Sequence, residues 1–136
     1  MRSKFFILIY FISAMVFAQQ NDATSQRKAR SLLRDGNELY QQKKYADAEV
    51  AYKKALEKNT TYPKAMYNLG NALYQQKRTE ESVQLFETIA QNSKDKLVKA
   101  EAFHNLGNSH MQSKNYGSAV EAYKNALRNN SLDEET

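Results

Sequence analysis

The chain has 136 residues, enough for one small domain, and 41% of them are hydrophobic while 26% are charged. It contains no cysteine, which excludes disulfides, thiol chemistry and a lipid-modified cysteine. The net charge of the whole chain is +5. Without Arg2 and Lys4, which lie in the first segment, 18 basic and 15 acidic residues remain, and the net charge is +3. Because the remaining Lys and Arg are interleaved with Glu and Gln along helical stretches, we expect no nucleic-acid binding.

The first segment has the three parts of a secretory signal peptide. Two positive charges lie in residues 1–4, an apolar run covers residues 5–16, and Ala18 is the small residue that precedes a cleavage site. The alternative is an uncleaved membrane anchor, but the run is shorter than the about 20 residues that span a bilayer. We therefore expect residues 1–18 to be removed and the mature protein to be exported. In a Gram-negative cell it would be an envelope protein of the periplasm, with no membrane span after cleavage.

Three later segments align with one another without gaps. They read RDGNELYQQKKYADAEVAYKKAL, NLGNALYQQKRTEESVQLFETIA and NLGNSHMQSKNYGSAVEAYKNAL, and their glycines, Gly36, Gly70 and Gly107, are spaced by 34 and 37 residues. This pattern resembles the tetratricopeptide repeat, which has a period of 34 residues and two helices per repeat. The resemblance implies an all-α, right-handed solenoid of three helix-turn-helix hairpins.

The repeats also predict how the chain is divided. The predicted parts are a signal peptide at 1–18, a polar linker at 19–28, a first repeat at 29–62, a second repeat with a three-residue insertion at 63–99, a third repeat at 100–133, and the start of a further helix or a tail at 134–136. We expect this array to be truncated at its C-terminal end, because Ser131 and the acidic residues after it are typical of a helix start.

Small residues in the repeats predict tight hairpins. Glycine has no Cβ, so the second helix of a hairpin can approach the first at that point, and Ala48 and Ala119 are small partners on the second helices. The second repeat departs most from the pattern, with Thr79, Ser82 and Ile89 at positions where the others have Tyr or Ala. We expect its second helix to pack less regularly, and the insertion near residues 92–99 to lengthen that helix or its loop.

Catalysis has no visible site in this sequence. No phosphate-binding loop, nucleophile elbow or zinc-binding HExxH motif occurs, and the glycines are explained by the repeat. His104 and His110 are six residues apart on one predicted helix, so they point in different directions and do not chelate one ion. We expect no enzyme activity, no metal and no cofactor, with His110 packed structurally.

A stripe along the first helix of each repeat is the candidate partner-binding groove, because tetratricopeptide arrays line their concave groove with positions 2, 5, 6, 9, 12 and 13. Amides and aromatic rings dominate the stripe, and a ladder of Asn can bind the backbone of an extended peptide. The predicted site residues are Arg34, Asn37, Tyr40, Gln41, Lys64, Tyr67, Asn68, Asn71, Tyr74, Gln75, Glu101, His104, Asn105, Asn108, Met111 and Gln112. Arg30 and Leu33 occupy the same stripe. The alternative is that the Asn side chains make local hydrogen bonds within the repeats.

One ligand class is disfavoured by the same resemblance. In the tetratricopeptide clamps that bind chaperone C-terminal carboxylates, three positions are basic. Here those positions hold Leu33, Glu101 and Asn105, although the two clamp asparagines are matched by Asn37 and Asn68. We therefore expect the groove not to bind a terminal carboxylate.

The last complete helix is the second candidate surface. Val120, Tyr123 and Leu127 lie on it with no repeat after them, and a repeat buries its apolar side only against a neighbour. This pattern favours either truncation or self-association at this end. A self-assembly module and a cell-wall enzyme accessory are accordingly the alternatives to an interaction scaffold.

The chain as a whole is similar to the exported repeat proteins of the Bacteroides aerotolerance (Bat) operons, of the BatC type. The similarity rests on the signal peptide, the string RDGNELYQQKKYADAEVAYKKALEKN, the insertion and the string AEAFHNLGNSHMQSKNYGSAVEAYKNALRNN. It implies a non-catalytic scaffold in an aerotolerance or stress complex of the cell envelope, with von Willebrand factor A-domain membrane proteins as partners.

Overall fold

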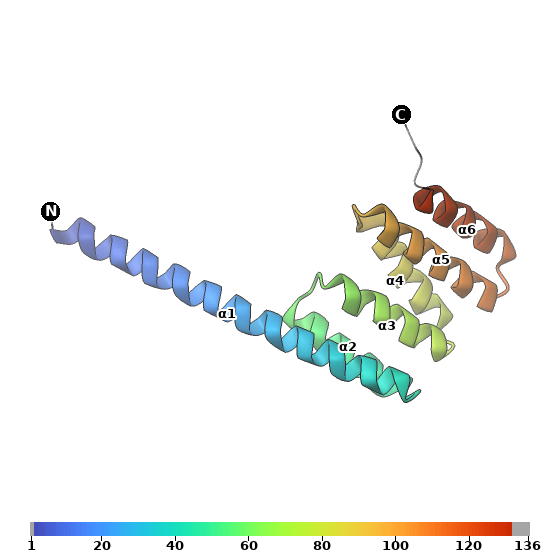
Figure 1. Ribbon diagram of the computed structural model, residues 1–136, viewed down its shortest axis with the longest axis horizontal. Helices are drawn as coiled ribbons and strands as arrows, with labels where there is room; N and C mark the ends of the chain where they lie inside the picture. Colours follow the sequence, from blue (N-terminus) through green and yellow to red (C-terminus); the bar gives the residue numbers. More distant parts are fainter. Residues whose placement is uncertain (1, 132–136) are drawn as a thin grey trace.

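The described part of the protein is entirely helical. The computed structural model describes residues 2–131, except the side chains of residues 2–14, 16 and 17. The helices are α1 (Arg2–Gln41), α2 (Tyr45–Lys58), α3 (Pro63–Gln75), α4 (Thr79–Asn92), α5 (Lys96–Gln112) and α6 (Tyr116–Asn130). They form the predicted all-α array of hairpins α1–α2, α3–α4 and α5–α6, with α6 at the end of the array (Figure 1).

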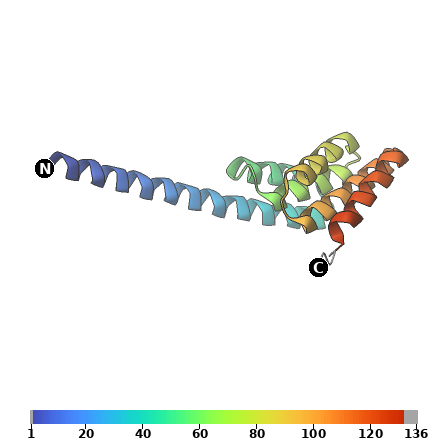
Figure 2. The same cartoon turned by 90° about the horizontal axis from the view of Figure 1, so that it is seen from above.

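Each helix packs against the next one along the chain, and the first helices of successive hairpins also touch, α1 with α3 and α3 with α5. The apolar core has two parts. One joins the first hairpin to α3, and the other lies among α3, α4, α5 and α6. Seen from above, α1 extends far beyond the array as a straight rod (Figure 2). The α1, α3 and α5 helices therefore form one continuous side of the array.

Glycine sets the distance between the two helices of each hairpin. A Cβ on Gly36 would lie 2.5 Å from Cε1 of Tyr52, and one on Gly70 would lie 2.8 Å from Cζ of Phe86. These separations are shorter than van der Waals contact, so any side chain there would push the helices apart. The third hairpin repeats the contact, which confirms the predicted role of the repeat glycines.

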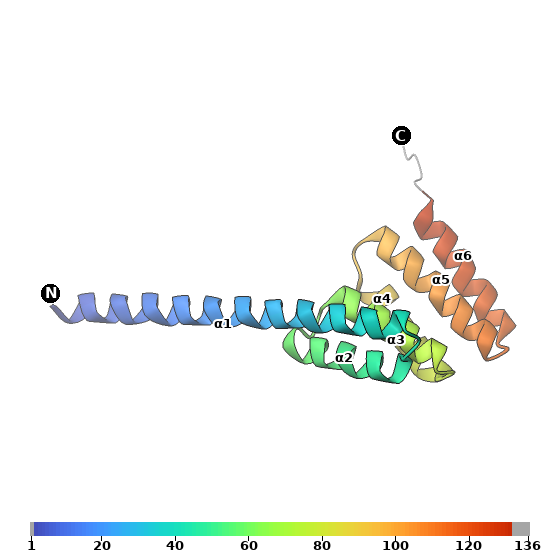
Figure 3. The ribbon, with the colours of Figure 1, turned by 60° about the horizontal axis from the view of Figure 1, so that its bottom comes forward.

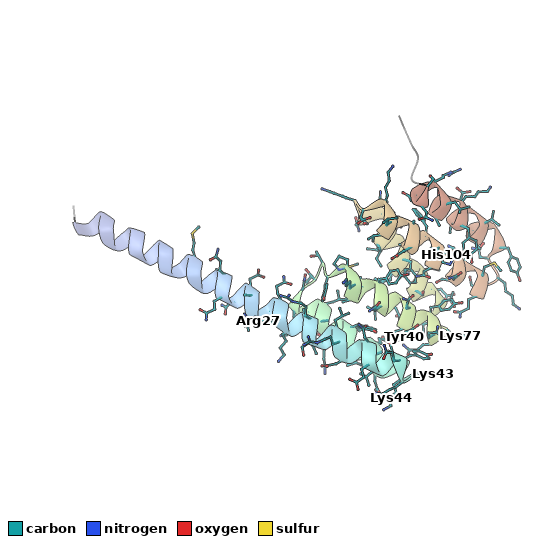
Figure 4. All side chains as sticks on the ribbon, in the orientation of Figure 1. Arg27, Tyr40, Lys43, Lys44, Lys77 and His104 are labelled. Carbon is teal, nitrogen blue, oxygen red and sulfur yellow. The ribbon has the colours of Figure 1, made fainter. Side chains whose placement is uncertain are left out.

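The turn inside each hairpin has a left-handed residue. Lys43, Lys77 and Lys114 have φ angles of 60°, 62° and 61°, a region that glycine prefers at helix C-termini. The turn is closed by backbone hydrogen bonds, such as the 2.9 Å bond from the N–H of Lys43 to the carbonyl of Tyr40. Figure 4 shows Lys43 and Lys77 at the ends of α1 and α3. The three turns therefore have the same backbone geometry, although each has a lysine where glycine would adopt the left-handed conformation more easily.

The segment 19–28, which the sequence predicts as a polar linker, lies inside α1 and continues the helix into the first hairpin (Figure 3). Its second half contacts the end of α2. The hydroxyl of Ser25 donates to the carbonyl of Lys58 at 2.8 Å, and Nδ2 of Asn59 donates to Oε1 of Gln26 at 3.0 Å. These bonds anchor the segment to the first repeat.

The structure does not test the predicted signal peptide or the predicted C-terminal segment, so both stay predictions. No helix in the described part of the chain is long and apolar enough to cross a membrane. The predicted signal peptide includes Met1, and most of its side chains lie outside the described residues. Residues 132–136 also lie outside them, including 134–136, where the start of a further helix or a tail is predicted. Ser131 ends α6, with its N–H donating to the carbonyl of Leu127 at 2.9 Å.

The two helices of the second hairpin share fewer close contacts than those of the first and third, in the predicted direction, yet the unusual residues of α4 are buried. Phe86 and Ser82 are both fully buried, and Ile89 is 6% exposed. The Ser82 hydroxyl lies 2.9 Å from the Ser109 hydroxyl of α5 and donates to the carbonyl of Gly70. Since its polar atom is bonded, serine fits this buried position as well as alanine does.

The three extra residues lengthen α5, and not α4 or the loop after it as the sequence predicts. The helix begins at Lys96, four residues before the repeat pattern resumes at Ala100. Asp95 caps it, because its Oδ1 accepts hydrogen bonds from the N–H groups of Leu97 at 2.8 Å and Val98 at 3.3 Å. The extra turn places Leu97 beside α6, at the end of the array.

Candidate functional site

The predicted site residues lie on α1, α3 and α5 and divide into two groups. Seven are exposed: Arg34, Gln41, Lys64, Gln75, Glu101, His104 and Met111. Nine are half-buried: Asn37, Tyr40, Tyr67, Asn68, Asn71, Tyr74, Asn105, Asn108 and Gln112. The half-buried residues lie where successive hairpins meet. Each of these side chains is therefore partly packed between repeats and partly exposed at the surface.

A pocket of about 210 Å³ opens between α1 and α3. We call it the amide pocket, and it is lined by Asn37, Tyr40, Gln41, Tyr52, Asn68 and Asn71. Five of these six residues belong to the predicted site; Tyr52, on α2, was missed. The pocket is where the structure brings the predicted residues of the first two repeats together.

Asn37 organises the floor of the amide pocket. Its Oδ1 accepts a hydrogen bond from the Tyr52 hydroxyl at 3.0 Å and another from Nδ2 of Asn68 at 2.7 Å. This arrangement fixes both amides, because Asn37 must present its oxygen to the two donors. Within the described residues, Nδ2 of Asn37 and Oδ1 of Asn68 make no hydrogen bond. The pair therefore holds one donor group and one acceptor available to a ligand.

By contrast, all four polar side-chain atoms of Asn105 and Asn108, on α5, make hydrogen bonds. Nδ2 of Asn105 donates to the hydroxyl of Tyr67 at 2.5 Å, and Oδ1 of Asn105 accepts from Nδ2 of Asn108 at 3.3 Å. The Tyr123 hydroxyl donates to Oδ1 of Asn108 at 2.8 Å. For these residues the alternative stated from the sequence, local hydrogen bonding, describes what the side chains do.

An asparagine follows each repeat glycine, and an aromatic residue lies sixteen positions after that glycine. The asparagine is hydrogen-bonded to the second helix of its hairpin only where this aromatic residue is a tyrosine. Tyr52 donates to Asn37 in the first hairpin, and Tyr123 donates to Asn108 in the third. The second hairpin has Phe86 instead, which has no hydroxyl. Asn71, which lines the amide pocket, therefore lacks this tie to the second helix and bonds to Tyr67 on its own helix.

The tyrosines of this side remain neutral hydrogen-bonding groups at physiological pH. Burial raises the pKa of Tyr52 to about 12. It also raises the pKa of Tyr40 and Tyr67, although hydrogen bonds with Gln75 and Asn105 act in the opposite direction. Each ring thus offers an apolar face and an uncharged hydroxyl. Figure 4 shows Tyr40 near the C-terminal end of α1.

Leu33 does not belong to the site. It is 7% exposed and packs in the core with Tyr52, Ala65 and Leu69. The stripe rule placed it in the groove by its position in the repeat, but α3 covers that position in the first hairpin. At the equivalent position of the third hairpin, His104 is exposed, with its ring centroid 5.6 Å from that of Tyr123 (Figure 4).

Sequence reasoning also missed an ionic contact that joins the first two hairpins. Glu49 of α2 accepts hydrogen bonds from Arg78 at 2.6 Å and Gln76 at 2.9 Å, both in the turn after α3. The only signal was an acidic residue where the other repeats have Val83 and Val120. In the part of the chain that the structure describes, no group of three His, Cys, Asp or Glu side chains is placed to hold a metal ion.

Comparisons with known proteins agree with this geometry. A family model described as "Tetratricopeptide repeat" matches residues 39–108, and a second with the same description matches residues 100–133. No curated protein sequence matches the chain.

Several solved structures share the fold. The N-terminal domain of stress-induced protein-1 (STI-1) from C. elegans is 24% identical, with 82% of this chain and 90% of that one covered and a TM-score of 0.72. The first TPR of Spaghetti (RPAP3), bound to the HSP90 peptide SRMEEVD, is 18% identical, with 80% and 84% covered and a TM-score of 0.70. The TPR domain of Arabidopsis FLU is 20% identical, with 80% and 99% covered and a TM-score of 0.71. The chain belongs to the tetratricopeptide repeat family.

Proposed function

We propose that the protein is a non-catalytic interaction scaffold that binds an extended peptide segment of a partner along the α1, α3 and α5 side. The observation that carries the proposal is the amide pocket, where the Asn37–Asn68 pair keeps a donor and an acceptor available beside Asn71. A peptide backbone needs one of each at every residue. The ring of Tyr40, which lines the pocket, suits apolar side chains.

The peptide is not an acidic C-terminus in this proposal. The similar Spaghetti domain was solved with SRMEEVD, whose last four residues include two glutamates. In this chain, Leu33 is in the core, Glu101 is an exposed acid and Asn105 is engaged with Tyr67. None of the three provides the cation that a carboxylate requires. A neutral or basic segment fits the side better.

Selection from a displayed library of random 12-residue peptides tests the proposal, followed by fluorescence polarisation with the enriched peptide. Asn71→Ala should weaken binding at least tenfold, because it removes an amide of the pocket that no ring of the second helix of its hairpin holds. Phe86→Tyr should also weaken binding, since its hydroxyl would bond Asn71 as Tyr52 bonds Asn37. Asn92→Ala, at an exposed asparagine outside the pocket, is the matched control and should bind normally. Failure to enrich any peptide, or unchanged binding by Asn71→Ala, would contradict the proposal.

The cellular setting is a further part of the proposal. The tripartite pattern of residues 1–18 supports export to the cell envelope, and the similarity to BatC-type proteins supports a role in an aerotolerance or stress complex with von Willebrand factor A-domain membrane proteins. Fractionation of cells expressing the full chain tests the first point, with the mass of the exported form showing whether cleavage precedes Gln19. Co-purification of an A-domain protein that is lost with Asn71→Ala tests the second.

A further inference from the structure

In the described part of the chain, two polar atoms of the amide pocket make no hydrogen bond. They are Nδ2 of Asn37 and Oδ1 of Asn68, and their two amide groups are joined at 2.7 Å through the other polar atom of each. Both residues are half-buried, yet no buried side-chain nitrogen or oxygen among the described residues lacks a hydrogen-bond partner. The two atoms are therefore accessible, and a ligand can reach them.

The two accessible atoms call for different partners. Nδ2 of Asn37 is a donor and Oδ1 of Asn68 is an acceptor, so a ligand group that satisfies both needs an acceptor and a donor on neighbouring atoms. A primary carboxamide has this arrangement, because its oxygen and its NH₂ group belong to one planar unit. A carboxylate offers only acceptors and an ammonium group only donors. Each of these ions would leave one of the two pocket atoms without a hydrogen bond.

The wall of the amide pocket carries no charge that would favour an ion. Its lining consists of three asparagines, one glutamine and two tyrosines. Burial raises the pKa of Tyr52 to about 12 and also raises the pKa of Tyr40, so both hydroxyls stay protonated at physiological pH. No opposite charge among the lining residues would offset the cost of removing a charged ligand group from water. The wall therefore favours a neutral group.

The size of the amide pocket suits one side chain. Its volume of about 210 Å³ is below the roughly 300 Å³ of the smallest sites that enclose a whole small ligand. A backbone amide continues into a Cα atom on each side, so it crosses the opening of a pocket of this size and does not enter it. A carboxamide lies at the end of a side chain and can enter.

The next junction along the array does not offer the same pair. One repeat later, the residues equivalent to Asn37 and Asn68 are Asn71 and Asn105. Nδ2 of Asn105 donates to the hydroxyl of Tyr67, and its Oδ1 accepts from Asn108, so both of its polar atoms are bonded within the protein. The accessible amide pair therefore belongs to the first junction and not to the second.

We propose that the amide pocket binds the carboxamide side chain of a glutamine or asparagine in the partner's segment. The carboxamide oxygen accepts from Nδ2 of Asn37, and its NH₂ group donates to Oδ1 of Asn68, while the backbone of the segment crosses the opening of the pocket. This inference rests on the proposed function and names the residue type that the segment presents. A glutamate in place of the glutamine has the same shape and is rejected.

Small probes separate the side chain from the backbone. The N-acetyl N-methylamide derivatives of glutamine, glutamate and methionine have the same backbone amides and differ only in the side chain. NMR signals of the side-chain NH₂ groups of Asn37 and Asn68 follow their binding to protein purified from cells that express the whole chain. We expect weak but saturable binding of the glutamine derivative and about tenfold weaker binding of the other two, because each leaves a pocket atom without a hydrogen bond.

Equal binding of the three derivatives would overturn the inference, because the backbone would then satisfy the pair, and it would leave the proposed function standing. Absence of saturable binding by the glutamine derivative would also overturn it. The proposed function fails separately, when the library of 12-residue peptides yields no binder.

Asn37→Asp tests the assignment of the donor without removing the bonds inside the pocket. An aspartate oxygen still accepts from Tyr52 and Asn68, whereas the other oxygen replaces the free donor by an acceptor. The variant should lose the preference for the glutamine derivative and bind the corresponding lysine derivative more tightly than the unmodified protein does. Asn92→Asp, the same change at an exposed asparagine outside the pocket, is the matched control and should keep the preference. An unchanged preference in Asn37→Asp would overturn the inference.

Discussion

Replacing Glu49 with glutamine tests how the first two hairpins are joined. The Glu49 side chain is 9% exposed, and its carboxylate accepts hydrogen bonds from Lys53, Gln76 and Arg78. Burial by itself would raise its pKa, but these three donors outweigh burial and lower the pKa from 4.5 to about 2. A folded-state pKa below the unfolded value means that the ionised carboxylate stabilises the folded protein.

The size of the effect follows from the shift. A pKa lowered from 4.5 to about 2 corresponds to roughly 3 kcal/mol at neutral pH, since each unit is about 1.4 kcal/mol. Arg78 is 38% and Lys53 is 53% exposed, so solvent screens both partners and about 2 kcal/mol is the more realistic figure. This stabilisation is complete above about pH 4.5 and is lost as the pH falls through about 2.

Urea unfolding followed by far-UV circular dichroism measures the difference. At pH 7, Glu49→Gln should lower the free energy of unfolding by about 2 kcal/mol, and at pH 2 the variant and the unmodified protein should converge. Glu81→Gln is the control, because Glu81 pairs with the same Arg78 but is exposed, and it should change stability little. A loss of equal size at both pH values, or no loss at pH 7, would refute the electrostatic account of this contact.

Three backbone positions give further predictions for the same urea titration. Gly70→Ala should destabilise the protein by about 1–3 kcal/mol, because its Cβ would lie 2.8 Å from Cζ of Phe86, and an unchanged midpoint would show that the hairpin can open without cost. Gly117→Ala should stabilise by about 0.5–1 kcal/mol, since a Cβ there meets nothing within 4 Å and alanine favours the helix; a loss would contradict this. Lys77→Gly should stabilise by about 0.5 kcal/mol, because its φ of 62° costs lysine more than glycine, unless the lysine side chain makes a compensating contact.

The fold could be predicted because the repeat encodes it locally. Each of the three repeat glycines is paired with a ring sixteen residues later, and the structure places each such pair in contact, as with Gly36 and Tyr52. The burial of the unusual residues of the second hairpin depends on contacts that a single repeat does not contain. Ser82 is compatible with the core because its hydroxyl bonds to the carbonyl of Gly70 and lies beside the hydroxyl of Ser109, from the next repeat.

The candidate site could be predicted in outline and not in its contacts. The stripe rule selects residues that the structure places on the α1, α3 and α5 side, but it treats all repeats as equal. Leu33 is buried because α3 covers the first hairpin, whereas the equivalent His104 of the last hairpin is exposed. The difference between Tyr52 and Phe86 is visible in the sequence, yet its consequence for Asn71 depends on a hydrogen bond that only the packed helices show.

The most direct test of the scaffold account is an NMR titration of the protein with the peptide selected by display. The account predicts that the side-chain amide signals of Asn37, Asn68 and Asn71 shift together and show contacts with the peptide backbone, while the signal of Asn92 stays in place. Shifts confined to α6, or to the surface around Val50, would contradict the assignment of the amide pocket as the peptide-binding site.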